Sequence, residues 1–178
     1  MKKRVLSGIG LLALMFIVGA AIRAQDNAGK EPPRTPAAAI SVNWNDIGGR
    51  LVAMAEDFPE DKYDYRPNDQ VRTFASVLRH VAGSNFGLLN QLEGKKVGNG
   101  ENDPSATEFK TKAQIVDFLK KSVDEGASVL KSQGDQAALK HLADWIGYTE
   151  HMGEHYGQLV VYYRNSGMVP PESRPKKK

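Results

Sequence analysis

Apolar residues recur every three or four positions in four stretches of this chain, a spacing that places them on one face of an α-helix. The first stretch covers residues 44–58 and is closed by Pro59, which cannot continue a helix. The second begins near Thr73, a residue type that favours the N-cap position, and ends before a polar loop over residues 94–105. The predicted core faces are Trp44, Ile47, Leu51, Met54, Ala55 and Phe58 on the first helix, and Phe74, Val77, Leu78, Val81, Leu88, Leu89 and Leu92 on the second.

The other two stretches lie in the C-terminal half of the chain. Thr111, with Gln114 three residues later, matches a capping box, so the third helix is expected over residues 111–132, with Gly134 as its stop signal. The last helix is expected over residues 142–165, before an exit rich in glycine and proline. No segment has the alternating pattern of a convincing strand. The predicted fold class is therefore all-α, a four-helix bundle.

The chain begins with a segment typical of export. Three basic residues precede an uncharged run over residues 5–22, so residues 1–24 are predicted to be a signal peptide, and the protein is expected in the periplasm or outside the cell. An uncleaved membrane anchor is the alternative. Residues 25–40, rich in Pro, Ala, Gly and charge, are predicted to be a flexible linker. The bundle is expected over residues 41–173, followed by a basic tail at residues 174–178.

The distribution of charge argues against a nucleic-acid partner. The chain carries 24 basic and 21 acidic residues, a net charge of +3. Four of the basic residues lie within residues 1–24, so the basic balance belongs to the ends of the chain and not to the folded part. Once the signal is removed, we expect no stable membrane association. Because the chain has no cysteine, its stability must come from an apolar core or from a core plus a metal ion.

The most distinctive polar pattern is the pair His151 and His155. An i, i+4 spacing on a helix projects both imidazoles from one face, and neutral imidazole is a common ligand of zinc, nickel, copper and iron. His80, in the middle of the second helix and beside core positions, can face this pair across the bundle. These three residues are the predicted metal ligands. His141, beside Lys140 at the start of the last helix, is predicted to be a solvated histidine instead.

Other interpretations of the histidines stay open on the sequence. Histidines on helices are often surface residues or hydrogen-bonded core residues, and in that case the bundle is a metal-free interaction domain. Met152 follows His151 where a zincin protease has glutamate, so the protease pattern is absent. Glu150, Glu154 and Tyr148 could each supply a general acid or base, and the sequence does not choose among them.

Several segments resemble the DinB-like family, also called DinB/YfiT-like metalloenzymes. The resemblance covers residues 44–173. It is carried by His80-Val81-Ala82, by the pair His151 and His155, and by the run His155-Tyr156-Gly157-Gln158-Leu159 with the Arg, Gly and Pro-Pro exit of the last helix. It implies an up-down-down-up four-helix bundle and a divalent ion bound by His80, His151 and His155. Relatives of known activity include transferases that join low-molecular-weight thiols to electrophiles and a metal-dependent isomerase of maleylpyruvate.

Two functions follow from this resemblance as expectations. The first is a metal-dependent hydrolase or transferase acting on a small molecule, with zinc or nickel, or else iron, as the ion. The second is a non-catalytic metal-binding or stress-associated protein in which the ion stabilises the bundle. Export separates the domain from intracellular thiols, which disfavours thiol transfer. A small-molecule substrate is the expected partner, and a homodimer is an open alternative to a monomer.

Overall fold

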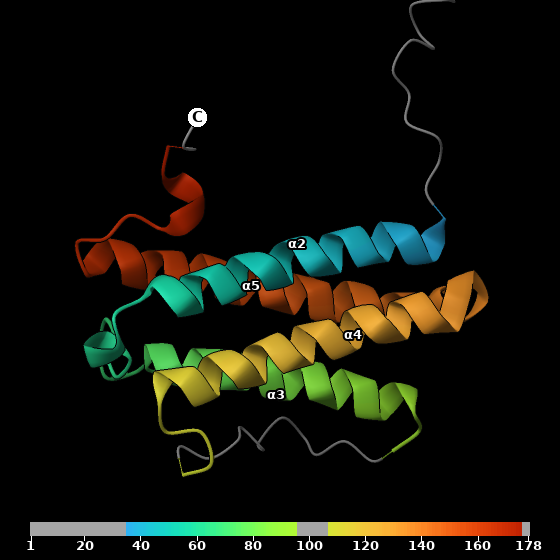
Figure 1. The fold of residues 1–178 in the computed structure, drawn as a ribbon, viewed down its shortest axis with the longest axis horizontal. Coiled ribbons are helices and arrows are strands. Elements are labelled where there is room, and N and C mark those ends of the chain that lie inside the picture. Colours follow the sequence, from blue (N-terminus) through green and yellow to red (C-terminus); the bar gives the residue numbers. More distant parts are fainter. Residues whose placement is uncertain (1–34, 96–106, 176–178) are drawn as a thin grey trace, which may run out of the picture. The chain divides into compact units, whose positions relative to one another are not determined.

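The computed structural model describes residues 35–95 and 107–175 (Figure 1). These residues form four long helices and two short 3-10 turns. The helices are α2 (Pro36–Asp57), α3 (Phe74–Leu92), α4 (Lys112–Lys140) and α5 (Leu142–Asn165), and the turns are η1 (Glu60–Lys62) and η2 (Pro171–Ser173). The all-α class is confirmed. The segment interpreted as a signal peptide, residues 1–24, lies outside the described residues.

The four helices pack as a bundle in which α2 and α3 each contact both α4 and α5. Contacts between their ends show that α2 is parallel to α5 and antiparallel to α4, while α3 is antiparallel to α5. The directions are therefore up, down, down and up in chain order, as the resemblance implies. The pairs that set them are Trp44 with Trp145 and Phe58 with Tyr163, Ala37 with Asp135 and Glu56 with Lys120, and His80 with His151 and Gln91 with Asp144.

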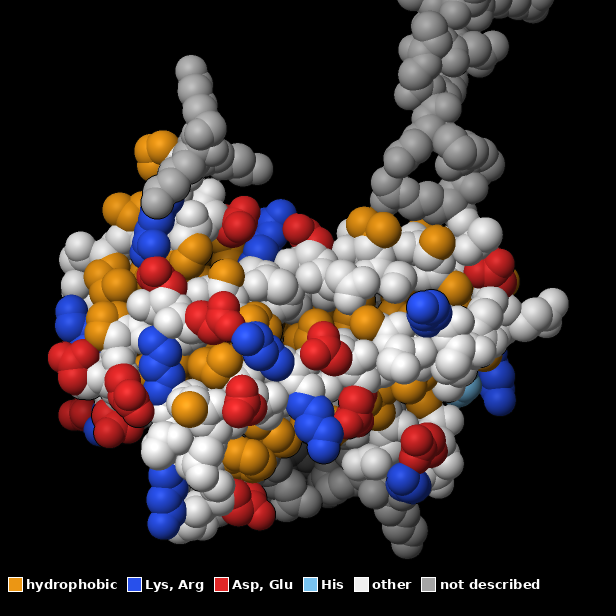
Figure 2. Space-filling model, viewed as in Figure 1, with side chains coloured by type: hydrophobic (Ala, Val, Ile, Leu, Met, Phe, Trp, Pro, Cys, Tyr) orange, Lys and Arg blue, Asp and Glu red, His pale blue; other side chains and the backbone are white. Residues whose placement is uncertain are grey.

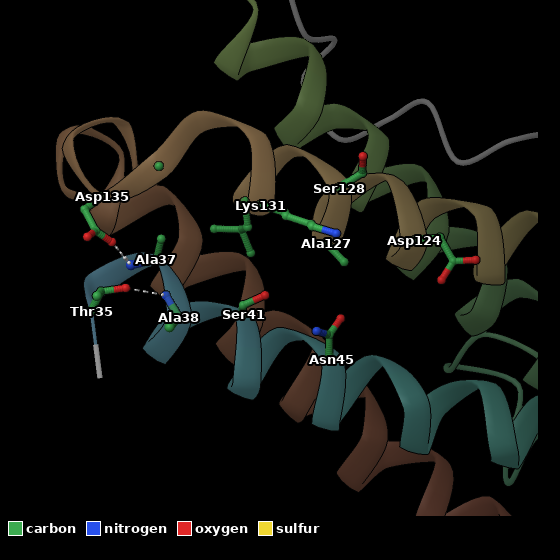
Figure 3. Close-up of a pocket in the computed structure, with 12 residues that line it drawn as sticks. Thr35, Ala37, Ala38, Ser41, Asn45, Asp124, Ala127, Ser128, Lys131 and Asp135 are labelled. Carbon is green, nitrogen blue, oxygen red and sulfur yellow. Dashed lines mark hydrogen bonds between the residues drawn. The ribbon is translucent and has the colours of Figure 1, made fainter. Parts of the chain in front are cut away.

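The helix α2 begins well before residue 44, so the prediction of a linker over residues 25–40 is wrong for its last part. Figure 3 shows two side chains at this helix N-terminus. The Thr35 hydroxyl accepts the N–H of Ala38 at 3.3 Å, and Asp135 accepts the N–H of Ala37 at 3.0 Å. Pro36 occupies the first turn, where a missing N–H costs nothing. Pro36 thus starts a helix here; residues 25–34 lie outside the described residues.

The core contains the apolar faces that the periodicity predicts, and its tightest contact joins α2 to α4. Trp44 is fully buried, packs edge-on against Trp145 with ring centroids 5.2 Å apart, and donates its Nε1–H to the Val123 carbonyl at 2.9 Å. The Trp44 ring lies directly against Gly126. A side chain at Gly126 would overlap this ring, so the glycine is required for the close approach of the two helices.

The N-terminus of α4 is confirmed as a capping box. The Thr111 hydroxyl accepts the N–H of Gln114 at 3.3 Å, and the Gln114 side chain accepts the N–H of Thr111 at 3.1 Å. The predicted end of this helix at residue 132 is wrong. Gly134 does adopt a left-handed conformation, with φ of 72°, but helical residues resume after it and continue to Lys140. The glycine therefore kinks α4 without ending it.

The last helix has the bounds that the sequence predicts, residues 142–165. Its end is fixed by Gly167, whose φ of +74° is a left-handed conformation that glycine adopts without strain. The N–H of Met168 then bonds to the Tyr163 carbonyl at 2.9 Å, and the N–H of Gly167 bonds to the Arg164 carbonyl at 3.0 Å. These two bonds form a Schellman motif, which turns the chain back toward α2.

The residues after α5 are anchored to the C-terminal end of α2. Arg174 donates to both carboxylate oxygens of Asp57, at 2.8 Å and 2.5 Å, and Asp57 also accepts a hydrogen bond from the Tyr163 hydroxyl at 3.1 Å. The sequence predicted that Arg174 begins a basic tail. In the structure Arg174 belongs instead to the packed domain. The bidentate pair closes the turn at η2 against the bundle.

We expect Arg174→Gln to destabilise the protein near neutral pH and to matter less in acid. The hydrogen bond from Arg174 holds the pKa of Asp57 below its usual value of 3.8. Stability from the pair is therefore fully present above that value and is lost as the pH falls through the lower pKa of the folded state. Urea unfolding at about pH 7 and about pH 2 measures the effect. Arg164→Gln, the same change at an exposed position, is the control. Equal destabilisation by Arg174→Gln at both pH values would contradict the assignment.

The surface of the bundle mixes charges of both signs. Figure 2 shows acidic and basic side chains interspersed over the viewed face, with no large region of a single sign. None of the helices in the described part of the chain is long and apolar enough to cross a membrane.

Candidate metal centre

Three histidines from two neighbouring helices meet at one point in the bundle. His80 projects from the middle of α3, and His151 and His155 project from successive turns of α5. The antiparallel packing of these helices brings the imidazoles together, and all three side chains are half-buried. The structure thus gathers the three residues that the sequence analysis selected, and they could hold a metal ion.

The distances between the imidazole nitrogens suit a single ion. His151 Nε2 lies 3.1 Å from His80 Nε2 and 3.1 Å from His155 Nε2, and the three ligand atoms all lie within 4.8 Å of one another. Metal–nitrogen bonds of about 2.0–2.1 Å place neighbouring ligand nitrogens roughly 3.0–3.4 Å apart. The spacing on both sides of His151 falls within this range, so little movement is needed for all three nitrogens to bind one ion.

A chain of hydrogen bonds behind His155 fixes which of its nitrogens faces the cluster. His155 Nδ1 lies 2.8 Å from the Gln158 side-chain oxygen, Gln158 Nε2 donates to the Tyr162 hydroxyl at 3.3 Å, and that hydroxyl donates to the Arg72 carbonyl. Since an amide oxygen only accepts, His155 Nδ1 carries the proton and Nε2 carries a lone pair. Metal-binding histidines are commonly oriented by such a partner on the other ring nitrogen.

The surroundings of the histidines favour their neutral form. Burial, followed by the nearby His155, His80 and Arg72, lowers the pKa of His151 to about 4. Burial also lowers the pKa of His155 below its usual value, and the hydrogen bond that His155 donates to Gln158 partly offsets that effect. His151 Nδ1 is buried and has no hydrogen-bond partner among the described residues. At neutral pH these two imidazoles therefore present lone pairs, which is the form that binds a cation.

The remaining candidates from the sequence separate into those near the cluster and those away from it. His141 lies at the junction of α4 and α5, where its Nδ1 is 3.3 Å from Asp144, and it is half-buried and not fully solvated. Glu150 and Glu154 are exposed on α5, and Glu150 lines a different pocket, between α2 and α5. Tyr148 is half-buried, with its ring centroid 6.4 Å from that of His151. Of the three acid–base candidates, Tyr148 is the one that shares a pocket wall with His151.

A pocket of about 390 Å³ opens beside the histidine cluster, between α3 and α5. His151 and Tyr148 form part of its wall. Burial is the main cause that raises the pKa of Tyr148 above its usual value of 10, and the charge of Asp144 adds to the effect. The phenol therefore remains protonated at neutral pH and can donate a hydrogen bond into the pocket. The complete lining is Ser84, Ala143, Asp144, Gly147, Tyr148 and His151.

Gln158 and Asp144 are not among the site residues predicted from the sequence. Gln158 lies three residues after His155, on the same helix face, and this i, i+3 spacing is the signal that would have identified it. Asp144 could have been found by the same rule, since it precedes Tyr148 by four residues and His151 by seven. Its contact with Gln91 of α3 depends on tertiary packing, which the sequence pattern does not reveal.

We expect Gln158→Leu to weaken zinc binding at least about tenfold, because the substitution removes the acceptor that orients His155. Leucine is similar in size to glutamine, so the packing around Tyr162 is kept. Gln158→Glu retains an oxygen that accepts the Nδ1–H and should keep wild-type affinity or exceed it. Competition with a chelating dye measures the affinity, and circular dichroism checks the fold. Wild-type affinity in Gln158→Leu would show that the hydrogen-bond chain does not support the site.

Comparison with sequence models of protein families gives a match that covers most of the bundle. The sequence model described as the DinB superfamily matches residues 45–162, which include α3, α4 and all three clustered histidines. No curated protein and no solved structure gave a significant match to the chain.

Proposed function

Because this chain belongs to the DinB superfamily, we propose that it binds a divalent metal ion through His80, His151 and His155 and acts as a metal-dependent hydrolase or transferase on a small molecule. The observation that carries the proposal is the convergence of the three ligand nitrogens beside a pocket of about 390 Å³. Imidazole ligands suit zinc and nickel, with iron as a further option. We also propose that this activity takes place in the periplasm or outside the cell, because residues 1–24 have the pattern of an export signal.

The residues around the cluster supply the parts that such an activity needs. A divalent ion held here provides Lewis-acid chemistry, which activates a small molecule toward a nucleophile. His151 belongs to both the cluster and the pocket wall, so a molecule in the pocket lies next to the ion site. Tyr148 can donate a hydrogen bond or a proton to an oxygen of that molecule, and Ser84 adds a hydroxyl group from α3.

One observation supports a non-catalytic role instead. Glu150 and Glu154 are exposed, and neither carboxylate lines the pocket beside His151, where a base would meet a bound molecule. In that alternative the ion would stabilise the bundle by holding α3 to α5. The pocket beside His151 favours catalysis, because a purely stabilising site needs no adjoining space for a substrate.

Turnover by metal-loaded and metal-depleted protein tests the proposal. The substrates are a panel of small esters, amides and electrophiles with thiol acceptors, and the protein is loaded in turn with zinc, nickel and iron(II). We expect activity only in the loaded protein, and no activity in His155→Ala. Tyr148→Phe should keep its metal while its kcat falls about a hundredfold, the typical contribution of a general acid.

Control variants separate the outcomes of this experiment. His141→Ala removes the histidine outside the cluster and should leave the metal content unchanged. Activity that is equal in His155→Ala and wild type would contradict the proposal. Stoichiometric metal with no turnover on any substrate would favour the stabilising role.

A further inference from the structure

We propose that the pocket beside His151 selects small molecules that carry a cationic amino group, and that Asp144 is the acceptor for that group. The inference rests on the proposed function, because it describes the substrate class of the same site. In this arrangement one end of the molecule offers an oxygen to the histidine cluster, and the other end places an ammonium group against the Asp144 carboxylate.

The position of Asp144 on α5 gives the pocket two distinct ends. Asp144, Tyr148 and His151 follow one another at i, i+4 and i+7, so they share one face of the helix. Seven residues of α-helix rise about 10 Å, which sets the separation of the two ends along the helix axis. Between them lies Gly147, where an added Cβ would meet no atom within 4 Å. The space above Gly147 is therefore open to a ligand that reaches from one end to the other.

Asp144 provides the only carboxylate among the residues that line this pocket, and no lysine or arginine lines it within the described part of the chain. The pocket end at Asp144 therefore offers a carboxylate acceptor that no lysine or arginine of the pocket wall faces. The side chain is 32% exposed, so it is partly removed from water and still reachable by a ligand. A cation bound there would form a charge-assisted hydrogen bond, whereas a second carboxylate would be repelled.

Two neighbouring side chains hold the Asp144 carboxylate in place. Gln91 Nε2 of α3 donates to Oδ1 at 3.0 Å, and His141 Nδ1 lies 3.3 Å from Oδ2. A carboxylate has about four lone-pair directions, so these two contacts leave acceptor capacity for a third partner. Because the group is already oriented, little side-chain entropy is lost when it binds an ammonium ion.

Three probes that differ only at one end test this inference. They are 6-aminohexanoate, hexanoate and adipate: each offers one carboxylate to the ion, and the far end is an ammonium, a methyl or a second carboxylate. Isothermal titration into the zinc-loaded protein gives the affinities. For a partly exposed carboxylate we expect 6-aminohexanoate to bind about fivefold to tenfold more tightly than hexanoate, and adipate to bind least tightly.

Three variants test which residues cause the preference for the probe with an ammonium group. Asp144→Asn should bind 6-aminohexanoate and hexanoate equally, whereas Glu150→Gln, the same change of charge on α5 but outside this pocket, should keep the wild-type preference. Gly147→Leu should weaken all three probes about tenfold or more by filling the pocket, since the Cβ at this position meets no atom within 4 Å and the side chain extends into the open space. All three variants should keep the full metal content, because none changes a histidine of the cluster.

The outcomes distinguish this inference from the proposed function. Full metal content with equal affinities for 6-aminohexanoate and hexanoate in the wild type contradicts only the role of Asp144 and not the proposed function. The same holds if no probe binds, if Asp144→Asn keeps the preference, or if Gly147→Leu binds the probes as the wild type does. Wild-type protein that holds no metal contradicts the proposed function and this inference together.

Discussion

His151→Ala should abolish stoichiometric metal binding. His151 is the central residue of the cluster, since its Nε2 lies 3.1 Å from the Nε2 of both His80 and His155. Zinc sites with four ligands contribute about 10–16 kcal/mol, so the loss of one ligand corresponds to about 3 kcal/mol, or more than a hundredfold in affinity. The loss of the ion would also remove the connection between α3 and α5 that it would provide.

Thermal unfolding with and without added zinc measures this effect. A ligand that binds only the folded state at about one hundred times its Kd stabilises that state by about 2.7 kcal/mol. We expect zinc to raise the unfolding temperature of the wild type and of His141→Ala, and to leave that of His151→Ala unchanged. If zinc raised the unfolding temperature of His151→Ala as much as that of the wild type, the ion would be bound elsewhere.

Gly126→Ala should destabilise the bundle by about 3 kcal/mol, although alanine is the better helix former. A Cβ at this position would lie 2.4 Å from Cζ2 and 2.8 Å from Nε1 of Trp44. The ring is fully buried between Trp145 and α4, so it cannot move aside without losing its hydrogen bond to the Val123 carbonyl. That bond alone contributes about 1 kcal/mol.

Gly49→Ala is the matched control, because an added Cβ there meets nothing within 4 Å. The same substitution in the helix α2 should stabilise the protein by about 0.5–1 kcal/mol. Urea unfolding gives both values, and the two variants should shift the midpoint in opposite directions. A neutral or stabilising Gly126→Ala would mean that α2 and α4 do not pack as closely as the structure has them.

Local signals in the sequence predicted most of the helix limits. Thr73, Thr111 and the exit after residue 165 are short-range features whose partners lie within a few residues, so pattern alone identifies them. The start of α2 depends in part on Asp135, which is distant in sequence and reaches the Ala37 N–H only after folding. Local pattern also does not reveal that Gly134 only kinks α4. Helical residues resume after the glycine and bring Asp135 to α2.

In the candidate site, too, some features can be predicted from the sequence, and others depend on how the helices pack. The i, i+4 pair His151 and His155 is visible on one helix, and the position of His80 beside core residues of another helix predicts the third ligand, in agreement with the resemblance to a family. The distance between His80 and His151 depends on the antiparallel packing of α3 against α5, which periodicity does not determine. The charged end of the pocket at Asp144 depends on the same packing, because Gln91 of α3 orients its carboxylate.

Metal content per chain tests the central claim most directly. Protein purified without an affinity tag is analysed for zinc, nickel and iron by mass spectrometry, as wild type, His155→Ala and His141→Ala. The three-histidine site predicts close to one divalent ion per chain in the wild type and in His141→Ala, and almost none in His155→Ala. Equal and negligible metal in all three, with no uptake when the ions are added back, would contradict it.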